Sequence, residues 1–223
     1  MRSARNETAV RSLTGVGIVA AIVGALWMGP WAWWTFLLVL AYIGGQEAQR
    51  LFALAWPDSP VMGQHVVSRL AVGIPFAALA VMGWREGTFV SAVPLGWFVL
   101  LWTNDTAAYI VGRQWGRHKM APSISPGKSW EGWAGGALGT LLVAYFVLGS
   151  AWEGSVLSAP LWLGLGVMVS VFGPMGDLME SALKRKAGAK DSGDVLPGHG
   201  GILDRFDSHA LAAPLAALLL QFF

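Results

Sequence analysis

The chain of 223 residues contains no cysteine. A disulfide scaffold, a thiolate nucleophile and a cysteine-ligated zinc or iron–sulfur site are therefore excluded. Charge is also scarce, because Asp, Glu, Lys and Arg make up 13% of the residues, about half the share of roughly 25% that is usual in soluble domains. With 55% of the residues hydrophobic, an ordinary soluble exterior is excluded as well. The net charge of only +2 provides no basic face for nucleic acid, so neither DNA nor RNA is an expected partner.

What the sequence has instead is a series of long apolar intervals. They predict an all-α, polytopic integral membrane protein with about seven transmembrane helices. The candidate spans are residues 11–28, 31–46, 70–84, 87–104, 132–152, 154–176 and 208–223. Gly29 and Pro30 separate the first two and predict a tight helical hairpin. Several intervals are shorter than the roughly 20 residues that cross a bilayer, so the count holds to about one span.

The distribution of Lys and Arg predicts the orientation of these spans. With the N-terminus inside, the inner segments hold fourteen of the fifteen basic residues, from Arg2 to Arg205, and the outer loops hold only Arg85. We therefore expect a cytoplasmic N-terminus, an outer C-terminus and a location in the inner (plasma) membrane. We expect one membrane-embedded domain over residues 1–223, with N-terminal helices in 1–100 and a motif-bearing catalytic core in 101–223.

Glycines on one face, at positions 132, 135, 136 and 139, predict close helix packing.

The scarce charge is concentrated near the C-terminus. Six of thirteen acidic and five of fifteen basic residues lie between Asp177 and Asp207. If the preceding helix continues, its polar residues at three- and four-residue spacing share one face: Asp177, Glu180, Ser181 and Lys184. Asp204 and Asp207 form a second acidic cluster. Because carboxylate oxygens without Cys or His clusters suit Mg²⁺, and Lys and Arg suit phosphate, this region predicts a magnesium and phosphate site.

Two loops in or near this charged region could bind an anion. One has few Cβ atoms, and the other has a composition typical of anion-holding loops. The first runs from Pro197 to Gly201, and its backbone can approach a phosphate closely. Within it, His199 is interpreted as a phosphate hydrogen-bond donor in preference to a general base. The second runs from Ser123 to Gly132 and predicts an anion-holding loop before a helix N-terminus. It is not a Walker motif, which needs two glycines at a fixed spacing before Lys-Ser/Thr.

These segments resemble a known family. The stretches SALKR from Ser181, KDSG from Lys190 and LPGHGGILDRFD from Leu196 are similar to the signature of the phosphatidate cytidylyltransferase (CDP-diacylglycerol synthase) family. The stretches Asp105–Gly112 and Ser125–Gly132 resemble the second motif of that family. The resemblance covers roughly residues 100–210.

The resemblance implies that CTP and phosphatidic acid react at the cytoplasmic membrane face to give CDP-diacylglycerol and pyrophosphate, with Mg²⁺ required. It implies metal-binding carboxylates at Asp177, Asp204 and Asp207, and Lys184 joins these three as a catalytic residue. The residues expected to bind substrate are Asp105, Ser125, Lys128, Glu131, Ser181, Arg185, Lys190, Asp191, His199, Gly200, Gly201 and Arg205. A second metal ion, a monovalent ion and a homodimer are left open.

Two alternatives remain at this point. One is a CTP-dependent transferase or kinase that acts on another lipid acceptor, such as a polyprenol or an archaeal-type lipid, because acceptor choice depends on apolar grooves that have no readable code. The other is a transporter, in which intramembrane carboxylates mark an ion path. The grouping of the acidic residues around one loop, and not within the spans, favours the enzyme.

Overall fold

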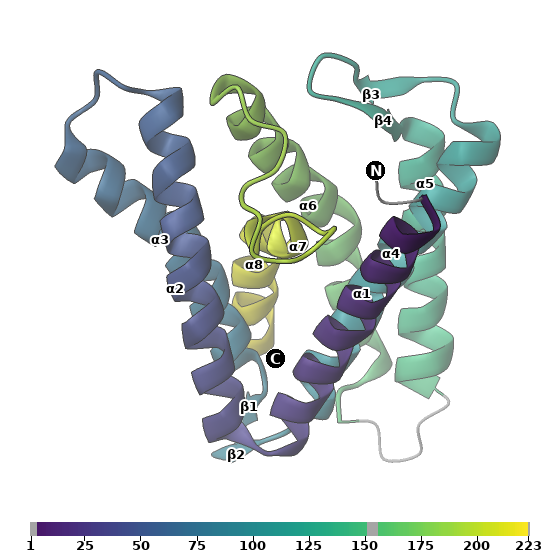
Figure 1. Cartoon of the computed structure of the whole chain (residues 1–223). Helices are drawn as coiled ribbons and strands as arrows, with labels where there is room; N and C mark the ends of the chain where they lie inside the picture. Colours follow the sequence, from purple (N-terminus) through teal and green to yellow (C-terminus); the bar gives the residue numbers. More distant parts are fainter. Residues whose placement is uncertain (1–3, 151–155, 223) are drawn as a thin grey trace.

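The structure, a computed structural model, describes residues 4–150 and 156–222. Arg2 and the interval ends at 151–152, 154–155 and 223 lie outside these residues. The described chain is a bundle of helices with two short hairpins (Figure 1). In chain order the elements are α1 (Ala4–Trp27), α2 (Pro30–Ala55), α3 (Val61–Met82), β1 (Trp84–Arg85), β2 (Thr88–Phe89), α4 (Ala92–Trp115), β3 (Lys119–Ala121), β4 (Ser125–Ser129), α5 (Trp130–Leu142), the π-helical segment η1 (Val143–Ser150), α6 (Ala159–Lys186), α7 (Leu203–Phe206) and α8 (His209–Phe222).

Each of the seven predicted apolar intervals contains a helical element, with 132–152 divided between α5 and η1. Two intervals also reach into the first hairpin, because Trp84 belongs to β1 and Thr88–Phe89 form β2, so the fourth helix begins at Ala92 and not at Gly87. The predicted hairpin is confirmed: α1 ends at Trp27, Gly29 has a φ of 100°, and Pro30 opens α2. Gly29 tolerates this left-handed backbone because it has no Cβ. The helices are longer than the apolar intervals, since α3 begins at Val61 and α6 continues to Lys186. Backbone hydrogen bonds hold a helix together whether or not its side chains are apolar.

Four stretches of the described chain are long and apolar enough to cross a membrane: Ala9–Trp27, Val61–Met82, Trp130–Gly149 and Ala159–Lys186. The apolar helix α8 is shorter, and α2 and α4 carry charged residues in their C-terminal halves. These helices support the all-α membrane class. The count of seven spans and the orientation stay predictions.

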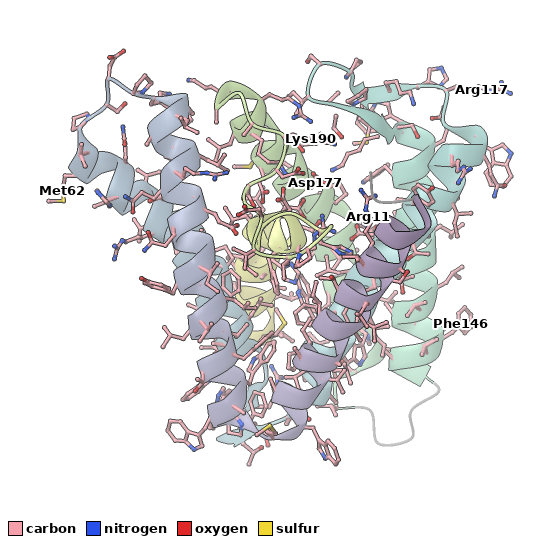
Figure 2. The ribbon with its side chains drawn as sticks, viewed as in Figure 1. Arg11, Met62, Arg117, Phe146, Asp177 and Lys190 are labelled. Atoms are coloured by element: carbon pink, nitrogen blue, oxygen red, sulfur yellow. The ribbon has the colours of Figure 1, made fainter. Side chains whose placement is uncertain are left out.

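Polar elements gather at one end of the bundle. The β3–β4 hairpin and the loop after α6 lie at this end, whereas the α1–α2 turn and the β1–β2 hairpin lie at the other (Figure 1). Asp177 lies inside the polar end with Lys190 above it, between Met62 and Arg117 at the two edges (Figure 2). Arg85 of β1 donates a hydrogen bond to the Leu220 carbonyl, so the end of α8 reaches the opposite side from the charged loop.

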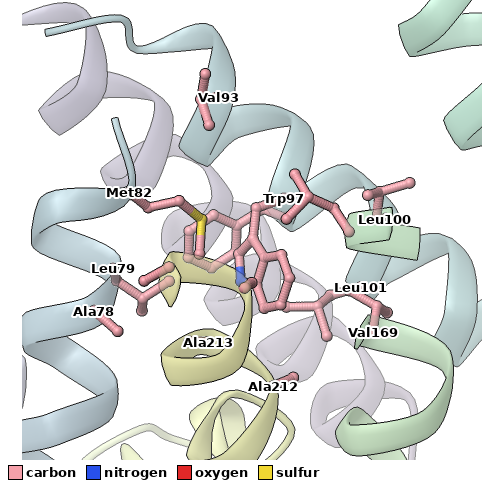
Figure 3. Close-up of a cluster of buried hydrophobic side chains, with 14 of the residues drawn as sticks. Ala78, Leu79, Met82, Val93, Trp97, Leu100, Leu101, Val169, Ala212 and Ala213 are labelled. Carbon is pink, nitrogen blue, oxygen red and sulfur yellow. The ribbon is translucent and has the colours of Figure 1, made fainter. Parts of the chain in front are cut away.

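The core is built around Trp97 of α4, which is fully buried. Side chains of four helices surround it (Figure 3): Ala78, Leu79 and Met82 of α3, Leu100 and Leu101 of α4, Val169 of α6, and Ala212 and Ala213 of α8. The small alanines let α8 approach the tryptophan closely. This packing fixes the start of α8, and therefore α7, relative to α4 and α6.

The predicted close packing at the α5 glycines is confirmed. A Cβ added at Gly132 would lie 2.9 Å from the Ala108 carbonyl oxygen, and one at Gly136 would lie 2.8 Å from Asn104 Oδ1. Gly135 and Gly139 are similarly close to Val111 and Ala107. The glycines therefore permit the backbone contact between α4 and α5.

The two hairpins are an addition to the predicted all-α fold. β1 pairs with β2, and β3 pairs with β4, both antiparallel. The predicted anion-holding loop before α5 is thus largely strand β4, in register with β3 through the pairs Lys119–Ser129 and Ala121–Ser125. Ser129 then caps α5, because its hydroxyl accepts a hydrogen bond from the Gly132 amide. Pairing with a second segment is a tertiary property that the composition of the loop did not indicate.

Candidate active site

The polar end of α6 presents its four predicted residues on one face. The Ser181 hydroxyl donates to Asp177 at 3.1 Å, and the Lys184 ammonium donates to Glu180 at 3.1 Å, both across one helical turn. Lys184 is only 7% exposed. The prediction that the helix continues through these residues is confirmed, and Lys184 is a buried cation.

Lys184 joins α6 to α7. Its ammonium lies 2.5 Å from Asp204 Oδ1, so one cation bridges Glu180 and Asp204. Burial acts to raise the pKa of Asp204, but the hydrogen bonds from Lys184 and from the amides of Gly201 and Ser192 outweigh it and hold the pKa below its usual value. Asp204 is therefore a paired carboxylate at neutral pH.

The second oxygen of Asp204 organises the glycine-rich loop. Oδ2 accepts hydrogen bonds from the amides of Ser192 and Gly201, each at 2.8 Å, and lies 2.9 Å from the Ser192 hydroxyl oxygen. Gly198 and Gly200 have φ values of 74° and 80°, which favour glycine. Gly200 and Gly201 lie against Asp204 and Ser192, so Gly201 directs its amide at a side chain of the protein.

Glu47 is a site residue that the sequence reasoning missed. This glutamate of α2 is 7% exposed. It accepts hydrogen bonds from the amides of Ile202 and Leu203, each at 3.0 Å, and its Oε2 lies 2.9 Å from the Ser192 hydroxyl oxygen. The one available signal was that Glu47 is the first acidic residue after a long charge-free interval, next to an apolar helix where a carboxylate needs a partner.

Other N-terminal contacts reach the same loop. Arg50 of α2 donates to the Ser192 carbonyl at 3.1 Å, and Thr14 of α1 donates to the Pro197 carbonyl at 3.0 Å. The motif-bearing region predicted over 101–223 is therefore held in place by helices from the first hundred residues.

The β3–β4 hairpin brings a second basic residue to α6. Lys128 lies 2.6 Å from Asp177 Oδ2 and donates to the Pro174 carbonyl at 3.2 Å. Asp177 thus receives Lys128 on one oxygen and Ser181 on the other. The sequence placed these residues in separate motifs, and the structure joins them.

Between α4, the hairpin and α6 lies a cavity of about 610 Å³, which we name the α4–α6 cavity. Its volume is in the range of small-ligand sites. Three basic and two acidic side chains line it: Arg113, Lys119, Lys128, Asp105 and Asp177. Of the residues predicted to bind substrate or metal, Asp105, Lys128 and Asp177 line this cavity.

A smaller cavity of about 220 Å³, the α1–α4 cavity, lies on the other side of Asp105. Asp105 and Ser208 line both cavities, and the predicted residues His199, Asp204, Arg205 and Asp207 line the smaller one. Burial raises the pKa of Asp207 well above the usual carboxyl value, and the nearby carboxylates of Asp177 and Glu180 raise it further. Burial, and then the positive charge of Arg205, lower the pKa of His199, which favours a neutral imidazole.

Several predicted substrate-binding residues are not brought to either cavity. Glu131 pairs with His118 at 2.6 Å and accepts from the amides of Arg117 and His118, so it fastens the turn before β3. Arg185 donates to the Ala189 carbonyl. Ser125, Ser181, Arg185, Lys190 and Asp191 are absent from the lining of both cavities, and their substrate contacts stay predictions.

The three predicted metal ligands do not form a ready-made cluster. Among residues 4–150 and 156–222, no group of three or more His, Asp or Glu side chains converges as a metal site. The oxygens of Asp204 are engaged by Lys184, Ser192 and Gly201. Asp177 and Asp207 are close enough for their charges to repel each other, and such a pair suits a cation between them.

Comparison with known proteins identifies the family of this part of the chain. The model of the cytidylyltransferase family matches residues 70–223. This range includes α4, the β3–β4 hairpin, α6 and α7, which form the polar walls of the two cavities. The chain belongs to the cytidylyltransferase family. Glu47 and Arg50 lie outside the segment matched by the family model, although they bind its loop.

Individual relatives carry a more specific name. Phosphatidate cytidylyltransferase of Staphylococcus haemolyticus is 48% identical over 123 residues, which cover 55% of this chain and 46% of the relative. The proteins of the same name from Staphylococcus aureus and Staphylococcus saprophyticus are 46% identical over 129 residues and 47% identical over 125, with the same coverage. The chain thus spans about half the length of the curated relatives it matches.

Proposed function

We propose that this chain transfers the cytidylyl group of CTP to phosphatidic acid, which gives CDP-diacylglycerol and pyrophosphate in phospholipid biosynthesis. The observation that carries the proposal is the ion pair between Lys128 and Asp177 in the wall of the α4–α6 cavity. It joins the two motifs of the matched family segment into one charged cavity at the ends of membrane-length helices. The names of the relatives support the choice of phosphatidate as acceptor.

In this reaction a phosphate oxygen of phosphatidic acid attacks the α-phosphorus of CTP. The new P–O bond forms as the bond from that phosphorus to the bridging oxygen breaks, and pyrophosphate leaves with the electron pair. A phosphate monoester is largely ionised near neutral pH, so the reaction needs no general base. Repulsion between the two anions is the main obstacle. Arg113, Lys119 and Lys128 in the α4–α6 cavity offset it and hold the triphosphate in place.

The residues present fit a divalent cation at Asp177 and Asp207. Burial, and then the negative charges of Asp177 and Glu180 nearby, raise the pKa of Asp207. When bound, Mg²⁺ would neutralise phosphate charge at this position. Asp204 was the third predicted ligand, but its bonds to Lys184, Ser192 and Gly201 favour a positioning role for it. It holds Lys184 next to Glu180 and closes the loop over the site.

The membrane arrangement is part of the proposal. We infer about seven spans, a cytoplasmic N-terminus and a site that faces the cytoplasm of the plasma membrane. Fourteen of fifteen basic residues on the predicted inner side support this orientation. The acyl chains of the acceptor then remain in the bilayer while its phosphate meets a water-soluble nucleotide.

Purified protein incubated with Mg²⁺, a panel of acceptors and CTP that is labelled, in parallel reactions, at the α-phosphate or at the γ-phosphate tests the function, because cytidylyl transfer carries the α-phosphate and a kinase carries the γ-phosphate to the lipid. We expect labelled CDP-diacylglycerol from phosphatidic acid, with no labelled product from polyprenol or from polyprenol phosphate. A labelled polyprenol product without CDP-diacylglycerol would replace this proposal with the lipid-kinase alternative. Cysteine labelling from either side of the membrane, at Lys190→Cys and Glu86→Cys, tests the orientation.

A further inference from the structure

The α1–α4 cavity has no counterpart in the sequence-based prediction, and its wall changes chemistry along its depth. Its charged part is lined by one cation, Arg205, and by the carboxylates of Asp105, Asp204 and Asp207. Ser208 and His209 supply uncharged polar groups, and apolar side chains complete it: Ile18, Ile22, Phe98, Leu101 and Trp102. α8 starts at His209 and runs away from the charged loop toward the opposite end of the bundle (Figure 1). The order charged, neutral polar, apolar therefore follows the direction from the polar end into the bundle.

His209 is the least satisfied polar side chain of this wall. It is 4% exposed, and neither ring nitrogen makes a hydrogen bond to another described residue. The Phe206 backbone interacts electrostatically with the imidazole, but it leaves both ring nitrogens without a hydrogen bond of normal geometry. Aromatic rings of Phe206, Phe98 and Trp97 surround the imidazole, with centroids 5.0, 5.1 and 6.3 Å away. An imidazole buried without partners is costly, so a ligand that supplies an acceptor is favoured here.

The order of groups along the wall matches the order of groups in a glycerophospholipid. Its phosphate is charged, its two ester carbonyls are neutral acceptors a few bonds deeper, and its acyl chains are apolar. The cavity volume of about 220 Å³ is below the range of about 300–1,000 Å³ for a complete drug-sized ligand. It suits the glycerol-ester part of a lipid.

We propose that the α1–α4 cavity binds the glycerol-ester region of the lipid acceptor, and that His209 donates a hydrogen bond to an ester carbonyl oxygen. This inference rests on the proposed function and names the part of the acceptor that is recognised. The acceptor phosphate lies toward the Arg205 guanidinium and the Ser208 hydroxyl, and Ser208 also borders the α4–α6 cavity. The chains leave between α1 and α4. A second groove, between α2, α3 and α6, is also apolar, but no buried side chain without a hydrogen-bond partner lines it.

The test compares dioleoyl phosphatidic acid with its dialkyl ether analogue, which lacks both carbonyl oxygens, in mixed detergent micelles with CTP and Mg²⁺. One hydrogen bond corresponds to about a five- to tenfold change in kcat/KM. We expect the wild-type protein to prefer the diester by about this factor, with the same KM for CTP. Equal kcat/KM for diester and diether would overturn the inference, and this measurement does not depend on any variant.

His209→Phe keeps an aromatic ring among Phe98, Phe206 and Trp97 and removes the hydrogen-bond donor. We expect it to lower kcat/KM for the diester to the level of the diether and to leave the KM for CTP unchanged. His209→Gln retains an N–H donor and should keep part of the preference. His65→Phe is the matched control, because His65 contacts Gln49 between α2 and α3, and it should keep the full preference. A His209→Phe protein that still prefers the diester would refute the role of His209. Absence of transfer to both acceptors would instead refute the proposed function, and this inference with it.

Discussion

Glu47 of α2 and Asp204 of α7 both lie 2.9 Å from the hydroxyl oxygen of Ser192. Because a hydroxyl has one proton, Ser192 donates to one of these carboxylates at a time. The two acids also accept the amides of Gly201, Ile202 and Leu203. A helix from the N-terminal part of the chain thus fixes the loop that carries the family signature, and through it the position of Asp204.

Replacing Glu47 should loosen this loop. Glu47→Ala leaves the amides of Ile202 and Leu203 without their acceptor, whereas the Ser192 hydroxyl can still donate to Asp204. Each unsatisfied group costs about 1–3 kcal/mol. We expect a thermal midpoint lower by several degrees and cytidylyl transfer reduced by at least about tenfold. Thermal unfolding in detergent and the CTP assay measure the two effects. Asp58→Asn, at an exposed position after α2, is the control, and equal behaviour of the two variants would remove Glu47 from the site.

Lys184 and Asp204 should behave as a coupled pair. Lys184→Met leaves the buried Asp204 without its cation, and Asp204→Asn leaves Lys184 with only Glu180 of its two carboxylate partners. Removal of one member of a buried ion pair costs up to about 3–5 kcal/mol. The double variant removes both charges, so its loss of stability should be smaller than the sum of the single losses by at least about 1 kcal/mol. Denaturant unfolding of the four proteins measures this coupling. Strict additivity would mean that the 2.5 Å contact contributes nothing. Cytidylyl transfer should remain low in all three variants.

A methyl group at Gly201 should prevent loop closure. Its Cβ would lie within 2.6 Å of the Glu47 carboxylate and would also collide with Ser192. We expect Gly201→Ala to lose most of its activity and to unfold at lower temperature. Gly73→Ala is the matched control, because nothing lies within 4 Å of its Cβ and it is inside helix α3. The control should be neutral or slightly stabilised, since alanine favours a helix by up to about 1 kcal/mol over glycine. A Gly201→Ala protein as stable and active as Gly73→Ala would contradict the packing at Gly201.

Metal binding should depend on Asp177 and Asp207 more than on the exposed acidic residues of the loop between α6 and α7. We expect Asp177→Asn and Asp207→Asn each to weaken Mn²⁺ binding by at least about tenfold, because each removes a charged oxygen ligand. Electron paramagnetic resonance of added Mn²⁺ measures this without reference to catalysis. Asp194→Asn, at an exposed position of the loop, should bind as the wild type does. Unchanged Mn²⁺ affinity in both site variants would place the cation elsewhere.

The helices were largely predictable because apolar intervals reflect the solvent in which the chain resides. Each of the seven intervals contains a helical element, although two of them also include residues of the β1–β2 hairpin. The face shared by Asp177, Ser181, Glu180 and Lys184 follows from helical spacing. The β3–β4 hairpin was not predicted, since strand pairing depends on a partner segment. The Ser125 region reads as a loop until its partner at Lys119 is known.

The site residues also divide into those that local sequence patterns indicated and those that only the packed structure revealed. Motif spacing indicated Asp177, Lys184 and Asp204. The family resemblance added Glu131 as a substrate-binding residue, which stays a prediction, and the structure shows its carboxylate paired with His118. Glu47 and His209 carried no motif. A single carboxylate or imidazole in an apolar helix becomes informative only when its neighbours are known.

The sequence by itself determined the membrane class, the family and the charged segment that bears the chemistry, because solvent preference and motif spacing are local properties of the chain. Only the tertiary structure decided which carboxylates are paired and which are exposed to a cavity. Asp204 is held by Lys184 and the loop amides, whereas Asp207 lines the α1–α4 cavity near Asp177. That difference arises from burial and from contacts between segments far apart in the chain, and these exist only once the helices have packed.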